Sequence, residues 1–124
     1  MEPLAEPFDF TFDHPDLSAA SSLRCAFAHT FAWLGDATSD AVLVLSELYA
    51  NAVIHGTPPI RVRADAANDG VQVEVDDSRS RFGDPRADSQ GLRLVAEVAR
   101  NWGVRTSAFG KTVWAEIAAR PTAG

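Results

Sequence analysis

Three polar side chains recur at intervals of four residues within an otherwise apolar segment. They are Glu47, Asn51 and His55, and this spacing places them on one face of a helix. A carboxylate can act as a general base, and a neutral amide oxygen suits a hard cation such as Mg²⁺. A solvated helix face would give the same pattern, and the spacing taken alone favours it. His55, next to Gly56, also suits a helix C-terminus, where the helix dipole favours a cation.

An aspartate at the end of a valine-rich segment is the second candidate. Val71, Val73 and Val75 alternate with polar residues, which is typical of a half-buried strand. Asp77 continues the valine face whereas Asp76 points the other way, so the Asp77 carboxylate must find hydrogen-bond donors on the buried side. A purine amino group is one such donor. Backbone N–H groups of a turn are another and, taken alone, they are the better explanation.

Two further segments have the composition of phosphate or base contacts. In the stretch 89–95 a loop passes through Gly91 and Leu92 into a predicted helix, and a helix N-terminus attracts phosphate. With one glycine, an ordinary loop-to-helix junction explains this stretch better. Near the end of the chain, 110–112 is typical of a hairpin turn entering a strand, where Thr112 either reaches a ligand or packs.

Three helices are predicted to carry or support these residues, because apolar side chains recur at helical spacing. Gly35, Gly56 and Gly103 follow the three segments, and glycine commonly ends a helix. Thr38 or Ser39 is the expected cap of the second helix. The predicted helices run from Asp16 or Ser18 to about Leu34, from about Asp40 to His55, and from Gly91 to Trp102.

Five strands are predicted from alternating apolar residues or short apolar runs. They lie near 8–12, 60–64, 71–77, 104–108 and 112–117. Asn68-Asp69-Gly70 is a hairpin turn signal, and 78–89 has no apolar periodicity and predicts a functional or disordered loop. Strands dominate the second half in consecutive hairpins. This order predicts an α+β fold, a mostly antiparallel sheet with helices on one face.

Composition limits the class of protein. The 124 residues are expected to form one domain, 1–124, and 46% are hydrophobic, which is enough for a core. A single cysteine, Cys25, argues weakly for a reducing compartment. No segment approaches the roughly 20 apolar residues of a membrane span, and 1–10 carries no basic residue, unlike a signal peptide. We therefore expect a cytoplasmic protein with no membrane association.

The charge distribution argues against nucleic acid as a direct partner. The formal net charge is −6, the arginines are scattered, and Lys111 is the one lysine. A duplex-binding protein usually shows a clustered basic face.

The order and spacing of the candidate segments resemble the motifs of the GHKL, or Bergerat-fold, ATPases. The resemblance covers about residues 20–118. It is closest to the anti-sigma-factor serine/threonine kinases and to the regulatory ATP-binding proteins of actinobacteria that are similar to them. Both Ser-Glu-x-x-x-Asn-Ala-x-x-His-Gly and Gly-Lys-Thr-Val-Trp are characteristic of that group. The matching segments are the N box at 47–51, the G1 box at 71–77, the G2 box at 91–92 and the G3 box at 110–112.

This resemblance implies a Bergerat-fold sandwich with a mostly antiparallel mixed sheet, and it assigns roles to individual residues. The implied roles are Glu47 as general base, Asn51 as ligand of a Mg²⁺ that bridges the phosphates, Asp77 as acceptor of the adenine amino group, Gly91 and Leu92 as the start of a phosphate-cradling helix, and Thr112 as support of the adenine end. The stretch before Gly91 corresponds to the ATP lid.

The activity implied by the resemblance is protein phosphorylation. Such a protein binds ATP with Mg²⁺, phosphorylates a serine on an antagonist protein and holds a sigma factor through a protein interface. Close relatives often form dimers, so a homodimer is compatible with the sequence.

Three departures from the family pattern keep two alternatives open. The G1 box usually reads Asp-x-Gly, but Arg79 stands in the glycine position; Ser89 replaces the first glycine of the G2 box, and the lid is short and poor in glycine. One alternative is a catalytically weak or inactive pseudokinase that acts as an interaction module. The other is a domain that never binds nucleotide, with a solvated 47–55 face and Asp77 capping a turn.

Overall fold

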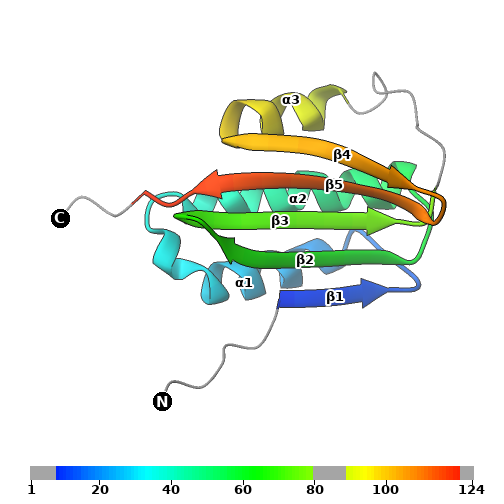
Figure 1. Ribbon diagram of the computed structural model, residues 1–124. Helices are drawn as coiled ribbons and strands as arrows, with labels where there is room; N and C mark the ends of the chain where they lie inside the picture. The colour runs from blue at the N-terminus through cyan, green and yellow to red at the C-terminus, as the bar shows by residue number, and fades with distance from the viewer. Residues whose placement is uncertain (1–7, 80–88, 121–124) are drawn as a thin grey trace, which may run out of the picture.

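The computed structural model describes residues 8–79 and 89–120. Strands and helices follow one another along the chain in the predicted order, with consecutive strand pairs in the second half (Figure 1). The elements are β1 (Phe8–Phe12), α1 (Ala19–Thr30), the 3₁₀ turn η1 (Ala32–Leu34), α2 (Thr38–His55), β2 (Ile60–Ala67), β3 (Gly70–Asp77), α3 (Ser89–Val98), β4 (Asn101–Ser107) and β5 (Gly110–Ala118).

One sheet of five strands forms the front layer in Figure 1, in the order β1-β2-β3-β5-β4. Every pair of neighbouring strands is antiparallel. The helices lie behind the sheet, and α2 crosses the back of the central strands (Figure 1). The predicted α+β class, with an antiparallel sheet and helices on one face, is confirmed.

The core lies between α2 and the sheet. Helix α2 buries one stripe of side chains at helical spacing, and the strands bury every second residue, so both periodicities meet in one apolar layer. The helix side of this layer consists of Ala41, Val44, Leu45, Leu48, Tyr49 and Ala52. The central strands contribute Ile60, Val62, Ala64, Val71, Val73, Val75, Ala115 and Ile117.

Aromatic contacts attach the edge strand β1 to the helices. The Phe8 ring meets the Phe27 ring edge-on at a centroid distance of 5.5 Å. Buried Tyr49 packs edge-on against Phe12 and donates its hydroxyl hydrogen to the carbonyl oxygen of Asp16 at 2.8 Å. Burial raises the pKa of the Tyr49 hydroxyl above its ordinary value. These contacts fix β1 and α1 beside α2.

Two predicted helix ends are wrong. The first helix ends at Thr30, and η1 completes the segment up to Gly35, where φ is 69°. The third helix ends at Val98 rather than Trp102, because residues from Asn101 onward pair with β5. Gly103 lies inside β4, and a Cβ added there would be 3.0 Å from the Trp114 ring. Pairing with a distant strand therefore overrides the local helical pattern.

Truncation of a core residue of α2 is expected to destabilise the domain far more than truncation of a surface residue. Leu45→Ala should lower the free energy of unfolding by about 2–5 kcal/mol, because Leu45 is fully buried against the sheet. Leu43→Ala, two residues earlier and 41% exposed, should cost less than about 1 kcal/mol. Urea unfolding measures both values, and equal losses would contradict the described packing of α2.

Candidate functional site

The polar residues of α2 lie beside its buried stripe. Glu47 and Asn51 directly precede the buried residues Leu48 and Ala52, and both are half-buried. The side-chain nitrogen Nδ2 of Asn51 is fully buried and has no hydrogen-bond partner among the described residues. An unsatisfied buried donor costs about 1–3 kcal/mol, so such a group calls for an explanation such as a ligand or a bound water.

Asp77 is the one buried charged residue in the described part of the chain, with 5% of its surface exposed. The side chain points to the helix side of the sheet, as its alternation with the valines predicts. Its Oδ1 accepts a hydrogen bond of 2.7 Å from the backbone N–H of Arg79, and its Oδ2 lies 3.8 Å from Nζ of Lys111. The carboxylate is thus held by a turn and neutralised by an ammonium group.

Gly56 brings the end of α2 directly against this carboxylate. A Cβ added at Gly56 would lie 2.8 Å from Cγ of Asp77 and 2.6 Å from the carbonyl oxygen of Ala52. No side chain fits there without displacing the helix or the strand. The helix that carries Glu47 and Asn51 and the strand that ends in Asp77 therefore meet through this glycine.

Arg79, which departs from the family pattern, ties the same two elements together. Its backbone N–H binds the Asp77 carboxylate, and its Nη1 donates to the carbonyl oxygen of His55 at 2.8 Å. A guanidinium at this position is favourable because a helix C-terminus carries partial negative charge. A further hydrogen bond of 2.8 Å runs from the backbone N–H of Ser78 to the carbonyl oxygen of Thr57, and it also joins the segment after β3 to the segment after α2.

Thr112 lies on the opposite face of the sheet from Asp77. Its hydroxyl donates to Oδ1 of Asp76 at 2.6 Å, and Asp76 is its directly paired residue on β3. The structure therefore does not bring Thr112 together with Asp77. The residue beside Asp77 is Lys111, which local sequence patterns did not single out because its partner is set by the pairing of β3 with β5.

Gly91 and Leu92 fall within α3 rather than at its first residue. The helix begins at Ser89, and half-buried Leu92, its fourth residue, packs against the core. Helix α3 lies against α2. The predicted lid, 78–89, falls largely on residues 80–88, which lie outside the described residues.

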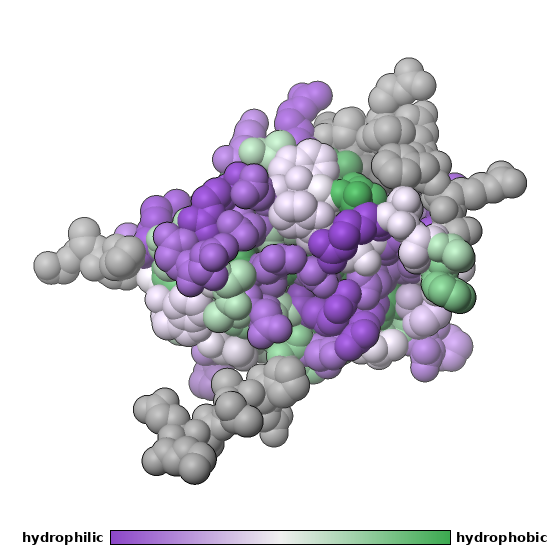
Figure 2. Space-filling view, viewed as in Figure 1, coloured by the Kyte–Doolittle hydropathy of each residue, from purple (hydrophilic) through white to green (hydrophobic). Residues whose placement is uncertain are grey.

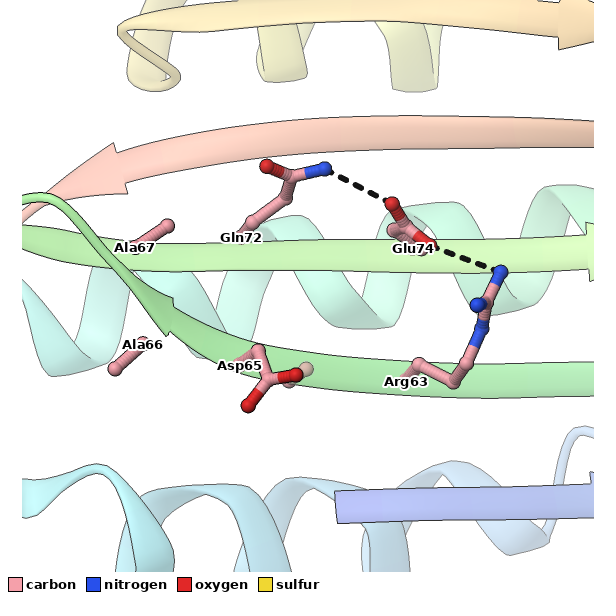
Figure 3. A pocket seen from close by; sticks show the side chains of 7 residues that line it. Arg63, Asp65, Ala66, Ala67, Gln72 and Glu74 are labelled. Atoms are coloured by element: carbon pink, nitrogen blue, oxygen red, sulfur yellow. Dashed lines mark hydrogen bonds and ion pairs between the residues drawn. The ribbon is translucent and has the colours of Figure 1, made fainter. Parts of the chain in front are cut away.

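The open face of the sheet carries paired charges rather than a second reactive site. Figure 2 shows this face, which is largely hydrophilic at its centre. A hollow of about 360 Å³ on it is lined by strands β2 and β3. Glu74 accepts a hydrogen bond of 2.9 Å from Gln72 and pairs with Arg63 (Figure 3). It also accepts a hydrogen bond of 2.8 Å from Arg105.

These partners satisfy the hydrogen-bonding capacity and the charge of Glu74. Burial would raise the pKa of Glu74, but the Arg105 hydrogen bond and the charge of Arg63 outweigh it and leave the pKa below its ordinary value. None of the predicted site residues lines this hollow.

A metal site made of protein side chains alone is absent from the described residues, where no three His, Cys, Asp or Glu side chains gather closely enough to hold an ion. In the same residues, no helix has both the length and the apolar character that a membrane span requires.

The chain belongs to the histidine kinase-like ATPase domain family, whose model matches residues 14–117. Among solved structures, it is similar to the RsbU and RsbW domains of Rv1364c from Mycobacterium tuberculosis, with 25% identity and a TM-score of 0.72. This match covers 95% of the chain and 34% of that longer chain.

A second similar structure is the histidine kinase domain of the blue-light activated histidine kinase EL346 from Erythrobacter litoralis. Its TM-score is 0.56 at 16% identity, with 85% of this chain and 61% of that chain covered, so it shows the shared fold alone. No curated protein matches the sequence.

The contact between Gly56 and Asp77 gives a direct test of how α2 meets β3. Gly56→Ala should lower the free energy of unfolding by about 1–3 kcal/mol, because the added Cβ would overlap a backbone carbonyl and the buried carboxylate. Gly103→Ala is the matched control, since its Cβ would meet only the Trp114 ring, a side chain that can shift. Chemical denaturation of both variants checks this, and a Gly56→Ala protein as stable as the wild type would contradict it.

Proposed function

We propose that the chain binds ATP with Mg²⁺ at the junction of α2 and β3 and acts as a serine/threonine protein kinase of the anti-sigma-factor type. The observation that carries this proposal is the buried, unpartnered side-chain Nδ2 of Asn51 on the helix whose end meets the buried Asp77 carboxylate. Membership of the histidine kinase-like ATPase family supports nucleotide binding. The similarity to a structure that contains an RsbW domain supports a regulatory role.

Asp77 suits the adenine amino group in position and in hydrogen-bonding capacity. An ionised carboxylate has about four acceptor sites, and the Arg79 N–H uses one of them. The remaining sites can accept from an amino group that enters between α2 and the sheet. In this arrangement Asp77 is a purine-recognition residue, with Arg79 holding its orientation.

Asn51 suits a Mg²⁺ that arrives with the nucleotide. Mg²⁺ is usually held by one or two protein oxygens together with substrate phosphates rather than by a cage of protein side chains. The Asn51 amide would provide one oxygen ligand, and its unpartnered Nδ2 would donate to a phosphate oxygen. When bound, the cation would neutralise charge on the phosphates during transfer. The start of α3, which includes Gly91 and Leu92, is proposed to lie near the phosphates through its backbone N–H groups, while the Leu92 side chain packs against the core.

Glu47 lies one helical turn before Asn51 and is proposed as the general base. Its carboxylate would accept the proton of the attacking serine hydroxyl. The serine oxygen forms a bond to the γ-phosphorus, the bond from that phosphorus to the β,γ-bridging oxygen breaks, and ADP leaves. The phosphorylated serine is proposed to belong to an antagonist protein, and the sigma factor to bind the same domain.

Arg79 favours one alternative, a pseudokinase that works as an interaction module. Its two bonds fill the turn after β3, where the family pattern has a glycine. If this turn limits nucleotide entry, partner binding would persist without phosphoryl transfer.

The base assignment predicts that Glu47→Gln abolishes phosphotransfer while ATP binding changes less than about threefold. Loss of a general base typically costs about 10²–10⁴-fold in rate. Transfer of radiolabelled γ-phosphate from ATP to the antagonist protein measures it, with Glu97→Gln, a substitution of an exposed residue of α3, as the control. Unchanged transfer by Glu47→Gln would exclude Glu47 as the base. ATP binding without transfer in the wild type would establish the pseudokinase alternative.

The two adjacent aspartates provide a test of base recognition. Asp77→Asn should weaken ATP binding by about tenfold or more, because a hydrogen bond to a charged group is worth about 1.5–3 kcal/mol. Asp76→Asn should change it by less than about threefold, because Asp76 faces the open side and binds Thr112 and Arg63. Calorimetric titration compares the two, and equal losses would contradict the proposed adenine contact.

A further inference from the structure

The residue directly opposite Asp77 across the β3–β5 ladder is Lys111, and the residue opposite Asp76 is Thr112. Directly paired residues of an antiparallel ladder project to the same face of the sheet. Lys111 is therefore on the helix side, where the proposed nucleotide binds, and Thr112 is on the open side.

The side-chain contacts agree with this pairing. Lys111 Nζ lies 3.8 Å from Oδ2 of Asp77, and the two side chains are 12% and 2% exposed. Thr112 instead donates to Asp76 on the other face at 2.6 Å. Of the two β5 residues, only Lys111 stands beside the carboxylate that is proposed to recognise the base.

The register that places Lys111 there is strongly constrained. Gly110 has a φ of 149° and lies so close to Asp77 that an added Cβ would collide with the Asp77 carbonyl oxygen, so glycine is required. Further along, Val113 is paired with Val75 and buried Ala115 with Val73. A slip by one residue would turn these apolar side chains out of the core.

The ammonium group of Lys111 retains donors that the described contacts do not fill. An ammonium has three N–H donors, and the 3.8 Å separation from Asp77 exceeds ordinary hydrogen-bond length. The burial of such a group is costly unless it is paired and hydrogen-bonded. Lys111 and Asp77 thus present a donor and an acceptor side by side.

We propose that Lys111 is a specificity-determining residue for the nucleotide base, donating from Nζ to the ring nitrogen N1 of adenine while Asp77 accepts from the 6-amino group. This inference rests on the proposed ATP site. A neighbouring donor and acceptor match the edge of adenine, where the acceptor N1 lies next to the amino donor. Lys111 then takes the second base contact, which the sequence resemblance assigned to Thr112.

The test compares ATP with 1-deazaadenosine triphosphate, which lacks the N1 acceptor but keeps the 6-amino group. The wild type should bind ATP about tenfold or more tightly than the analogue. Lys111→Met should bind the two with affinities within about twofold of each other, because the donor is gone. Thr112→Val should retain the wild-type preference. If Lys111 had a purely structural role, Lys111→Met would lose affinity for ATP and for the analogue equally, and the preference for ATP would remain.

Melting temperatures without nucleotide show whether each variant is folded. If Lys111→Met does not fold, Lys111→Gln takes its place and should reduce the preference for ATP at least about threefold. Full preference in the folded Lys111 variant, or its loss in Thr112→Val, would overturn the assignment of Lys111. Failure of the wild type to bind ATP at all would instead overturn the proposed nucleotide site, and the base contact with it.

Discussion

The burial of the Asp77 carboxylate against the end of α2 is the constraint on which the rest of the site depends. A buried charge is expensive unless hydrogen bonds and a counter-charge accompany it. Here Arg79 N–H supplies a hydrogen bond, and the Lys111 ammonium supplies the counter-charge. Gly56 removes the side chain that would keep helix and strand apart. Three separate segments are therefore held together by the need to accommodate one carboxylate.

Helix α2 links the stability of the domain to its proposed chemistry. The same helix buries Leu45 and Tyr49 against the sheet and carries Glu47 and Asn51 beside that stripe. Core packing fixes the rotation of the helix about its axis. That rotation determines where the Asn51 amide and the Glu47 carboxylate lie. The buried but unpartnered Nδ2 of Asn51 is a local cost, and a bound phosphate would remove it. Such local costs are common where a protein is built to bind a ligand.

Local patterns in the sequence predicted much of the fold and one orientation within the site. The alternation of valines with polar residues was enough to place Asp77 on the helix side, since strand periodicity is a local property. Local patterns could not predict where α3 ends or that Lys111 lies beside Asp77, because both depend on pairing between distant strands. Pairing with β5 draws Asn101 into β4, and contact of Gly110 with Asp77 sets Lys111 beside it. The chemical roles of Glu47 and Asn51 stay predictions.

The central claim, that Asn51 and Asp77 belong to one site for ATP and Mg²⁺, is tested most directly by thermal-shift titration. The wild type and Asn51→Ala would be titrated with ATP, with and without Mg²⁺. A ligand at about 100 times its Kd stabilises the folded state by roughly 2.7 kcal/mol, which is a visible shift. The account predicts a Mg²⁺-dependent shift in the wild type that is lost in Asn51→Ala. An absent shift at millimolar ATP, or the same Mg²⁺-dependent shift in both proteins, would contradict it.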